Sequence, residues 1–181
     1  MTTDEPPTGP DPEAITATIL ERWPETDVVH ALGATFFSLD PETHWPNFAT
    51  IVTTDEHDEG SPSRLDERAG AFRLNLGVSR ETFERVARAA GDAPDHAAVD
   101  RLFPHPVYAK QRWISIVNPS RSTFVEVVLQ LLTEAHDRLA AARARRATPP
   151  PDGTATTDDE TLEPRSGEGL AGSGQGRADL V

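Results

Sequence analysis

The chain has 181 residues, of which 36% are hydrophobic, and its formal net charge is −13 at pH 7. It contains no cysteine, which excludes disulfides, thiolate metal sites and a cysteine nucleophile. Residues 1–12 and 149–181 together carry −8 of the charge and leave −5 for the remainder. Because an acidic protein does not attract phosphate backbones at long range, we do not expect nucleic acid as a partner.

The distribution of apolar residues predicts one folded domain, residues 11–146, between two tails. Residues 147–181 are acidic, rich in proline and glycine, and lack aromatic side chains, so they bury too little surface to offset the entropy lost on folding. Residues 1–10 contain three prolines and fit the same description. We therefore expect both tails to be disordered. Without a signal-peptide pattern or a membrane-length apolar run, we expect a cytoplasmic protein with no membrane partner.

The first part of the domain predicts a helix followed by a hairpin. Asp11 is a suitable N-cap and Pro12 a suitable first helical residue, and Pro24 ends the helix. Two short apolar runs, residues 28–30 and 35–39, flank a glycine and predict a pair of antiparallel strands.

Two further strands follow, at residues 48–53 and 71–76, separated by a loop that is too polar to enter the core. Side chains alternate between the two faces of a strand. The second of these strands therefore places Phe72, Leu74 and Leu76 on one face and Arg73 and Asn75 on the other.

The last third of the domain predicts a helix, a strand and a helix. Ser79 caps the first helix and Gly91 ends it. Residues 92–106 read as irregular, residues 113–117 as a fifth strand, and a capping box at Thr123 opens the final helix. The order helix–four strands–helix–strand–helix predicts the α+β class, with an antiparallel sheet of about five strands and helices packed on one face.

Three motifs carry a resemblance to a known family. They are HWPNFAT at residues 44–50, FRLNLGVS at residues 72–79, and PHPVY at residues 104–108 followed by Trp113. Over roughly residues 15–138 the chain resembles an uncharacterised bacterial domain-of-unknown-function family. That resemblance implies no activity, because the family has none assigned.

More distantly, Pro106 and Tyr108 followed by a strand that begins with Trp113 are similar to the YjbR-type domains, small α+β proteins with a double-wing layout. This resemblance implies the same fold class. The DNA binding suspected for that group does not suit the acidic domain of this chain.

The candidate ligand site lies on the sheet face that helices leave open. Arg73 and Asn75 emerge there, and Pro104 and Pro106 prevent their segment from continuing as a central strand, so the segment folds back over a sheet edge. We expect a shallow pocket in which Arg73 and His105 are partly exposed. Its predicted border is Arg73, Asn75, His105 and Tyr108, with Trp45 or Trp113 as the apolar wall. Such a pocket could hold an anionic ligand; alternatively, Arg73 pairs with a loop acid.

Metal-type side chains are densest at residues 55–59, where His57 is flanked by carboxylates. Neighbouring residues of a loop point in different directions, and no helical metal-binding spacing occurs, so the segment also fits a solvated acidic loop. We expect no metal and no cofactor. Nucleophile-elbow and phosphate-loop signatures are absent from the sequence, and no catalytic residue is assigned.

Two functional hypotheses remain. The first is a non-catalytic binding or interaction module that uses the open sheet face to bind a small molecule or a protein. The second is a small enzyme in which His57, Arg73 and His105 share a pocket and act on an anionic small molecule.

Overall fold

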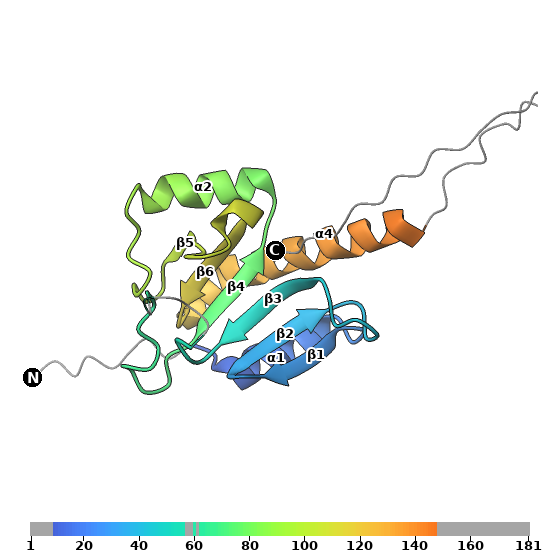
Figure 1. Ribbon diagram of the computed structural model, residues 1–181, viewed down its shortest axis with the longest axis horizontal. Helices are drawn as coiled ribbons and strands as arrows, with labels where there is room; N and C mark the ends of the chain where they lie inside the picture. Colours follow the sequence, from blue (N-terminus) through green and yellow to red (C-terminus); the bar gives the residue numbers. More distant parts are fainter. Residues whose placement is uncertain (1–8, 57–59, 61, 148–181) are drawn as a thin grey trace, which may run out of the picture. The chain divides into compact units, whose positions relative to one another are not determined.

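The computed structural model describes residues 9–56, 60 and 62–147, and within these ranges six strands form one antiparallel sheet (Figure 1). The strand order is β1-β2-β3-β4-β6-β5. The strands are β1 (Asp27–Ala31), β2 (Ala34–Ser38), β3 (Asn47–Val52), β4 (Arg73–Gly77), β5 (Leu102–Pro104) and β6 (Trp113–Val117). The α+β class is confirmed. The predicted tails lie outside the described residues, except for residues 9, 10 and 147.

Helices flank the strands in the expected order. They are α1 (Pro12–Arg22), α2 (Arg80–Ala90), and a C-terminal helix made of α3 (Arg121–Thr123), a π-helical turn η2 (Phe124–Val128) and α4 (Leu129–Ala147), with a short 3-10 helix η1 (Ala109–Gln111) before β6. None of the helices in the described ranges combines the length and the apolar character that a membrane span requires.

Local capping explains where these helices begin. Asp11 Oδ1 accepts the N–H of Ala14 at 2.8 Å, and Ser79 Oγ caps α2 as predicted. The predicted start of the last helix at Thr123 is wrong. Ser120 is the N-cap, since its Oγ accepts the N–H of Thr123 at 3.2 Å, and the helix begins three residues earlier than the capping box indicates.

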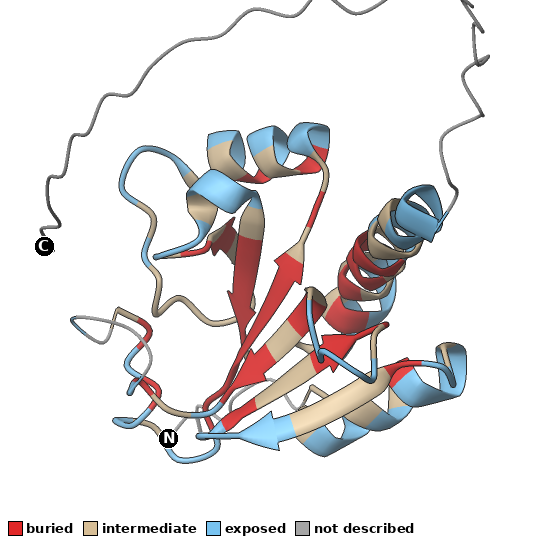
Figure 2. Cartoon of the chain, turned by 45° about the vertical axis from the view of Figure 1, so that its right-hand side comes forward, coloured by how far each residue is buried: buried red, intermediate tan, exposed pale blue. Residues whose placement is uncertain are grey.

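The helices cover one face of the sheet. α4 packs against β3 and β4, and α2 packs against β5 and β6. The main core combines Ile15 and Ile19 of α1, Val86 of α2 and the inward residues of η2 and α4 with Leu74 and Ile114 of the central strands. In Figure 2 the buried residues concentrate in the central strands and along the inward side of α4, whereas β1 contains only intermediate and exposed residues. We call the opposite face, which carries Arg73 and Asn75, the open face.

A β-bulge decides which residues of β3 reach each face. Phe37 pairs with Ala49, but Ser38 pairs with Asn47, so Phe48 is an extra residue on β3. Phe48 and Ala49 are consequently both buried in the main core. Asn47 lies instead on the open face, where it lines a cavity. A strict alternation of side chains does not predict this arrangement.

The loop between β3 and β4 covers one end of the open face, which corrects its assignment as too polar for the core. Leu65 is 1% exposed and joins a second apolar cluster with Val52, Phe103 and Val117. Ser63 of the same loop is fully buried.

Strand β5 lies inside the segment that we expected to be irregular. It has three residues, and Leu102, Phe103 and Pro104 pair with Ile116, Ser115 and Ile114 of β6. β5 is an edge strand, which is where a proline such as Pro104 is tolerated.

One carboxylate fastens α4 to the start of α2. Glu134 Oε1 accepts the N–H of Ser79 at 2.6 Å, and Glu134 Oε2 accepts the hydroxyl of Thr82 at 2.8 Å. Burial raises the pKa of Glu134, but the hydrogen bonds from Ser79 and Thr82 and the charge of Arg138 outweigh burial and leave the pKa below its ordinary value of 4.5. The ionised carboxylate therefore stabilises the N-terminus of α2.

We expect Glu134→Gln to lower the free energy of unfolding by about 1 kcal/mol at pH 7. The reason is that the neutral amide weakens the two partly exposed, charge-assisted hydrogen bonds that Glu134 accepts from Ser79 and Thr82. A lowered folded-state pKa contributes stability above pH 4.5 that is lost as pH falls through that folded-state pKa. The difference between the wild type and Glu134→Gln should therefore shrink below pH 4.5. Urea denaturation at several pH values measures it, and Glu126→Gln, at an exposed position, is the control. A pH-independent difference would contradict the role of the charge.

Candidate functional site

A cavity of about 440 Å³ opens on the open face, between β2, β3, β4 and β6 and the loops that carry Trp45 and His105. This volume lies within the roughly 300–1,000 Å³ that small-ligand sites occupy. All six residues that we predicted for the site line this cavity: Trp45, Arg73, Asn75, His105, Tyr108 and Trp113. The expected juxtaposition is therefore present, and ligand binding by these residues stays a prediction.

Asn75 is the centre of a polar network on the cavity floor. Its Oδ1 accepts hydrogen bonds from Arg73 Nε at 2.9 Å and from Ser115 Oγ at 2.7 Å, and its Nδ2 donates to Thr50 Oγ1 at 3.0 Å. Strand register explains the alignment, because Asn75 pairs with Thr50 on β3 and with Ser115 on β6. Three central strands thus present polar side chains side by side.

Arg73 is buried rather than partly exposed, which corrects our expectation. Only 1% of its surface is exposed, and it is the largest of the fully buried side chains in the described part of the chain. Its Nη1 donates to Ser63 Oγ at 2.8 Å, so the loop between β3 and β4 both covers and orients the guanidinium.

His105 is also buried, with 4% of its surface exposed, which again differs from our expectation. Its Nδ1 lies 3.0 Å from the backbone N of Val107 and 3.1 Å from that of Tyr108. Because both backbone groups are donors, Nδ1 is an acceptor and the ring proton sits on Nε2. Nδ1 of His105 is therefore not available as a base.

Aromatic side chains form the walls and the mouth of the cavity. The indole of Trp113 lies over Gly77, its strand neighbour, where a Cβ would come within 3.5 Å of the ring. Tyr108 and Trp45 stand at the mouth, 51% and 65% exposed respectively. The cavity is consequently polar at its floor and aromatic towards solvent.

Arg73 is the only formally charged side chain among the described residues that line the cavity. The floor of the cavity is therefore polar and rich in hydrogen-bonding groups. Sequence reasoning missed Asn47, Thr50, Ser63 and Ser115, since their positions depend on the bulge, the strand register and the loop. The sequence contains no local signal for any of these three features.

The structure describes only Asp55 and Glu56 of the acidic segment at residues 55–59. His57 and its next two neighbours lie outside the described residues, so the three-residue grouping of the enzyme hypothesis cannot be assembled. Asp55 is buried, and its Oδ2 accepts the N–H of Asp66 while Asp66 Oδ2 accepts the N–H of Asp55, both at 3.1 Å. These two reciprocal hydrogen bonds therefore join the start of the loop between β3 and β4 to a later part of the same loop. No group of three potential metal ligands gathers within the described ranges.

Comparison with protein families places the chain in a family whose function is not known. A family model described as a family of unknown function, DUF6194, matches residues 10–148. No curated protein and no solved structure matches the chain. The expected membership of an uncharacterised domain family is confirmed, whereas the similarity to YjbR-type domains stays a prediction. Because the match covers well over half of the residues, the chain belongs to the DUF6194 family.

Proposed function

We propose that the protein is a small-molecule-binding module whose cavity on the open face takes up a small organic anion. The observation that carries the proposal is the cavity itself, with the guanidinium of Arg73 and the amide of Asn75 on its floor and aromatic side chains at its mouth. A guanidinium forms charge-assisted hydrogen bonds with carboxylates and phosphates. The amide of Asn75 supplies a further polar group that can orient a ligand.

Binding is better supported than catalysis. Covalent catalysis needs a nucleophile that an adjacent base activates. Thr50 Oγ1 accepts a hydrogen bond from Asn75, and Nδ1 of His105 is occupied by two backbone N–H groups. Neither residue is thus placed as a member of an activated pair. The enzyme hypothesis therefore remains the second candidate, without a specific observation in its favour.

The experiment compares a flat carboxylic acid with its uncharged amide by isothermal titration calorimetry. We expect naphthalene-2-carboxylate to bind the wild type and naphthalene-2-carboxamide to bind it much more weakly. Arg73→Gln should weaken binding of the acid by roughly tenfold or more, the usual effect of losing a charge-assisted hydrogen bond. Arg85→Gln removes the same charge from an exposed position on α2 and should leave binding unchanged.

A second variant guards against misfolding of Arg73→Gln. Asn75→Asp retains an oxygen acceptor beside Arg73 but places a negative charge there, which repels an anionic ligand. It should also weaken binding of the acid. If the acid does not bind the wild type, or binds all three variants equally, the proposed function is wrong.

A further inference from the structure

Asn47 carries a hydrogen-bond acceptor at the cavity that the fold itself does not use. Its Oδ1 is buried and has no hydrogen-bonding partner among the described residues. Thr26 and Asp55 also have such an oxygen in the described part of the chain, but neither residue lines the cavity on the open face. A buried acceptor without a donor is unfavourable, so a group of this kind in a folded protein calls for an explanation.

The β-bulge places this amide beside the cavity. Ser38 pairs with Asn47 across the bulge, so Asn47 lies on the open face while Phe48 enters the main core. Asn47 as a whole is partly exposed, and it lines the cavity. The torsion that orients the amide of an asparagine is soft. Rotation about it can therefore turn Oδ1 towards a ligand in the cavity.

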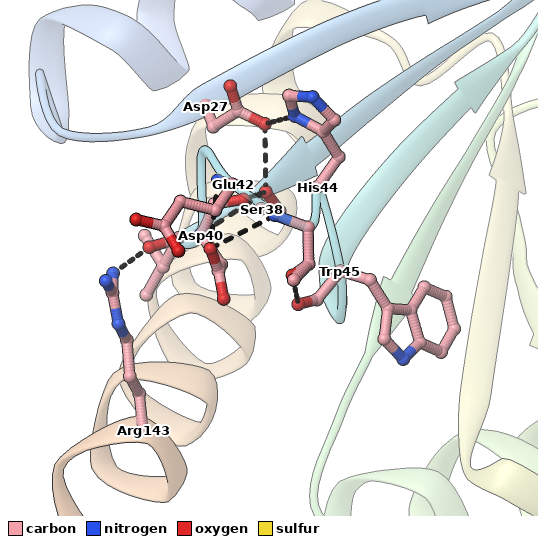
Figure 3. Close-up of polar contacts among 9 residues, drawn as sticks. Asp27, Ser38, Asp40, Glu42, His44, Trp45 and Arg143 are labelled. Atoms are coloured by element: carbon pink, nitrogen blue, oxygen red, sulfur yellow. Dashed lines mark hydrogen bonds and ion pairs between the residues drawn. The ribbon is translucent and has the colours of Figure 1, made fainter. Parts of the chain in front are cut away.

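The loop that leads into Asn47 is held in place by side-chain contacts (Figure 3). His44 Nδ1 lies 2.7 Å from Asp27 Oδ2, and Thr43 Oγ1 donates to the backbone oxygen of Trp45 at 2.8 Å. Figure 3 shows the Trp45 ring turned away from the Asp27–His44 pair. Because the backbone up to two residues before Asn47 is restrained, a ligand that binds there orders little further chain, which favours binding.

Aromatic rings stand around the cavity that Asn47 lines. Trp45 and Tyr108 are at its mouth and are both more than half exposed. A Cβ on Gly77 would lie 3.5 Å from the indole of Trp113 and 3.7 Å from the backbone oxygen of Phe48, so the indole and the start of β3 approach each other at Gly77. Flat rings pack on aromatic side chains in offset-stacked or edge-to-face arrangements. The cavity therefore suits a planar ligand.

We propose that Asn47 is a specificity-determining residue, whose Oδ1 accepts a hydrogen bond from a ring N–H of a planar heterocyclic ligand. Such a ligand supplies the donor that Oδ1 lacks and offers a flat face to Trp45 and Tyr108. The inference rests on the proposed function only in that the cavity takes up a small molecule. It does not involve the charge of the ligand, so the ring chemistry and the anionic class can be tested separately.

The experiment compares two neutral bicyclic probes by isothermal titration calorimetry. 2-Quinolone and coumarin share their ring skeleton and carbonyl group, but a ring oxygen of coumarin replaces the ring N–H of 2-quinolone. We expect the wild type to bind 2-quinolone about tenfold more tightly, because coumarin leaves Oδ1 of Asn47 without a donor. Asn47→Leu should abolish this preference, whereas Asn47→Asp, which keeps an acceptor oxygen, should retain it.

Melting temperatures separate a role in binding from a role in folding. Because Oδ1 of Asn47 has no partner in the described part of the free protein, Asn47→Leu should leave the melting temperature unchanged or raise it. Asn118 is the matched control, since its Oδ1 accepts the N–H of Phe72 at 3.0 Å and its Nδ2 donates to the backbone oxygen of Gly70 at 3.1 Å. Asn118→Leu should lower the melting temperature by about 4 °C or more and leave the preference for 2-quinolone unchanged.

The outcomes distinguish this inference from the proposed function. If neither probe binds the wild type, or both bind equally well, the role of Asn47 is overturned even where naphthalene-2-carboxylate binds. A preference that persists in Asn47→Leu, or a melting temperature of that variant as low as that of Asn118→Leu, overturns it as well. If 2-quinolone is preferred through Asn47 but naphthalene-2-carboxylate does not bind, the anionic ligand class is wrong and the role of Asn47 stands.

Discussion

Replacing Phe48 by alanine is expected to lower the free energy of unfolding by about 4 kcal/mol, within the usual range for a buried phenylalanine. The Phe48 side chain is 1% exposed. Its ring centroid lies 6.2 Å from those of Trp23 and Phe37 and 5.5 Å from that of His136. It thus fills the space between the end of α1, the sheet and α4. These rigid elements cannot collapse into the vacated volume, so a cavity should remain. Urea denaturation followed by circular dichroism measures the change.

Two variants test whether the effect comes from core packing. Phe48→Leu retains most of the apolar volume and should cost about 1.5 kcal/mol or less. Val125→Ala, at a half-exposed position of the C-terminal helix, should change stability by less than about 0.5 kcal/mol. A loss below about 1 kcal/mol for Phe48→Ala would mean that the β-bulge does not direct Phe48 into the core. The placement of Asn47 at the cavity would then be wrong as well.

Local rules account for the parts of the fold that the sequence predicts. The caps at Asp11 and Ser79 are set within a few residues, and alternation along β4 separates Leu74 from Arg73. The features that sequence reasoning misses depend on distant pairing. β5 has only three residues, too few to show an alternation, and it exists as a strand because β6 offers it an edge.

The candidate site likewise combines features that local rules predict with features that depend on distant strand pairing. The alternation in β4 and the prolines around His105 sufficed to bring six residues to one cavity. The polar floor could not be predicted from the sequence, because Thr50 and Ser115 are 25 and 40 residues from Asn75 in the sequence and reach it only through strand register. The burial of Arg73 also escaped prediction, since it depends on how the loop with Ser63 folds over the sheet.

Replacing Asn75 by alanine is expected to lower the free energy of unfolding by about 3 kcal/mol, because the substitution removes one member of two buried hydrogen bonds and one partly buried hydrogen bond at once. Arg73 Nε and Ser115 Oγ both lose their acceptor on Asn75, and both residues are at most 1% exposed, so water does not readily replace that acceptor. For a domain of this size the melting temperature should fall by about 10 °C. Differential scanning calorimetry measures it.

The partners of Asn75 provide graded controls for this network. Ser115→Ala removes one of the three hydrogen bonds and should cost about 1 kcal/mol. Asn75→Asp keeps the oxygen that Arg73 and Ser115 share and loses the donor to Thr50, so it should also cost about 1 kcal/mol. A loss of stability in Asn75→Ala no larger than that in Ser115→Ala would show that the floor is not organised by Asn75.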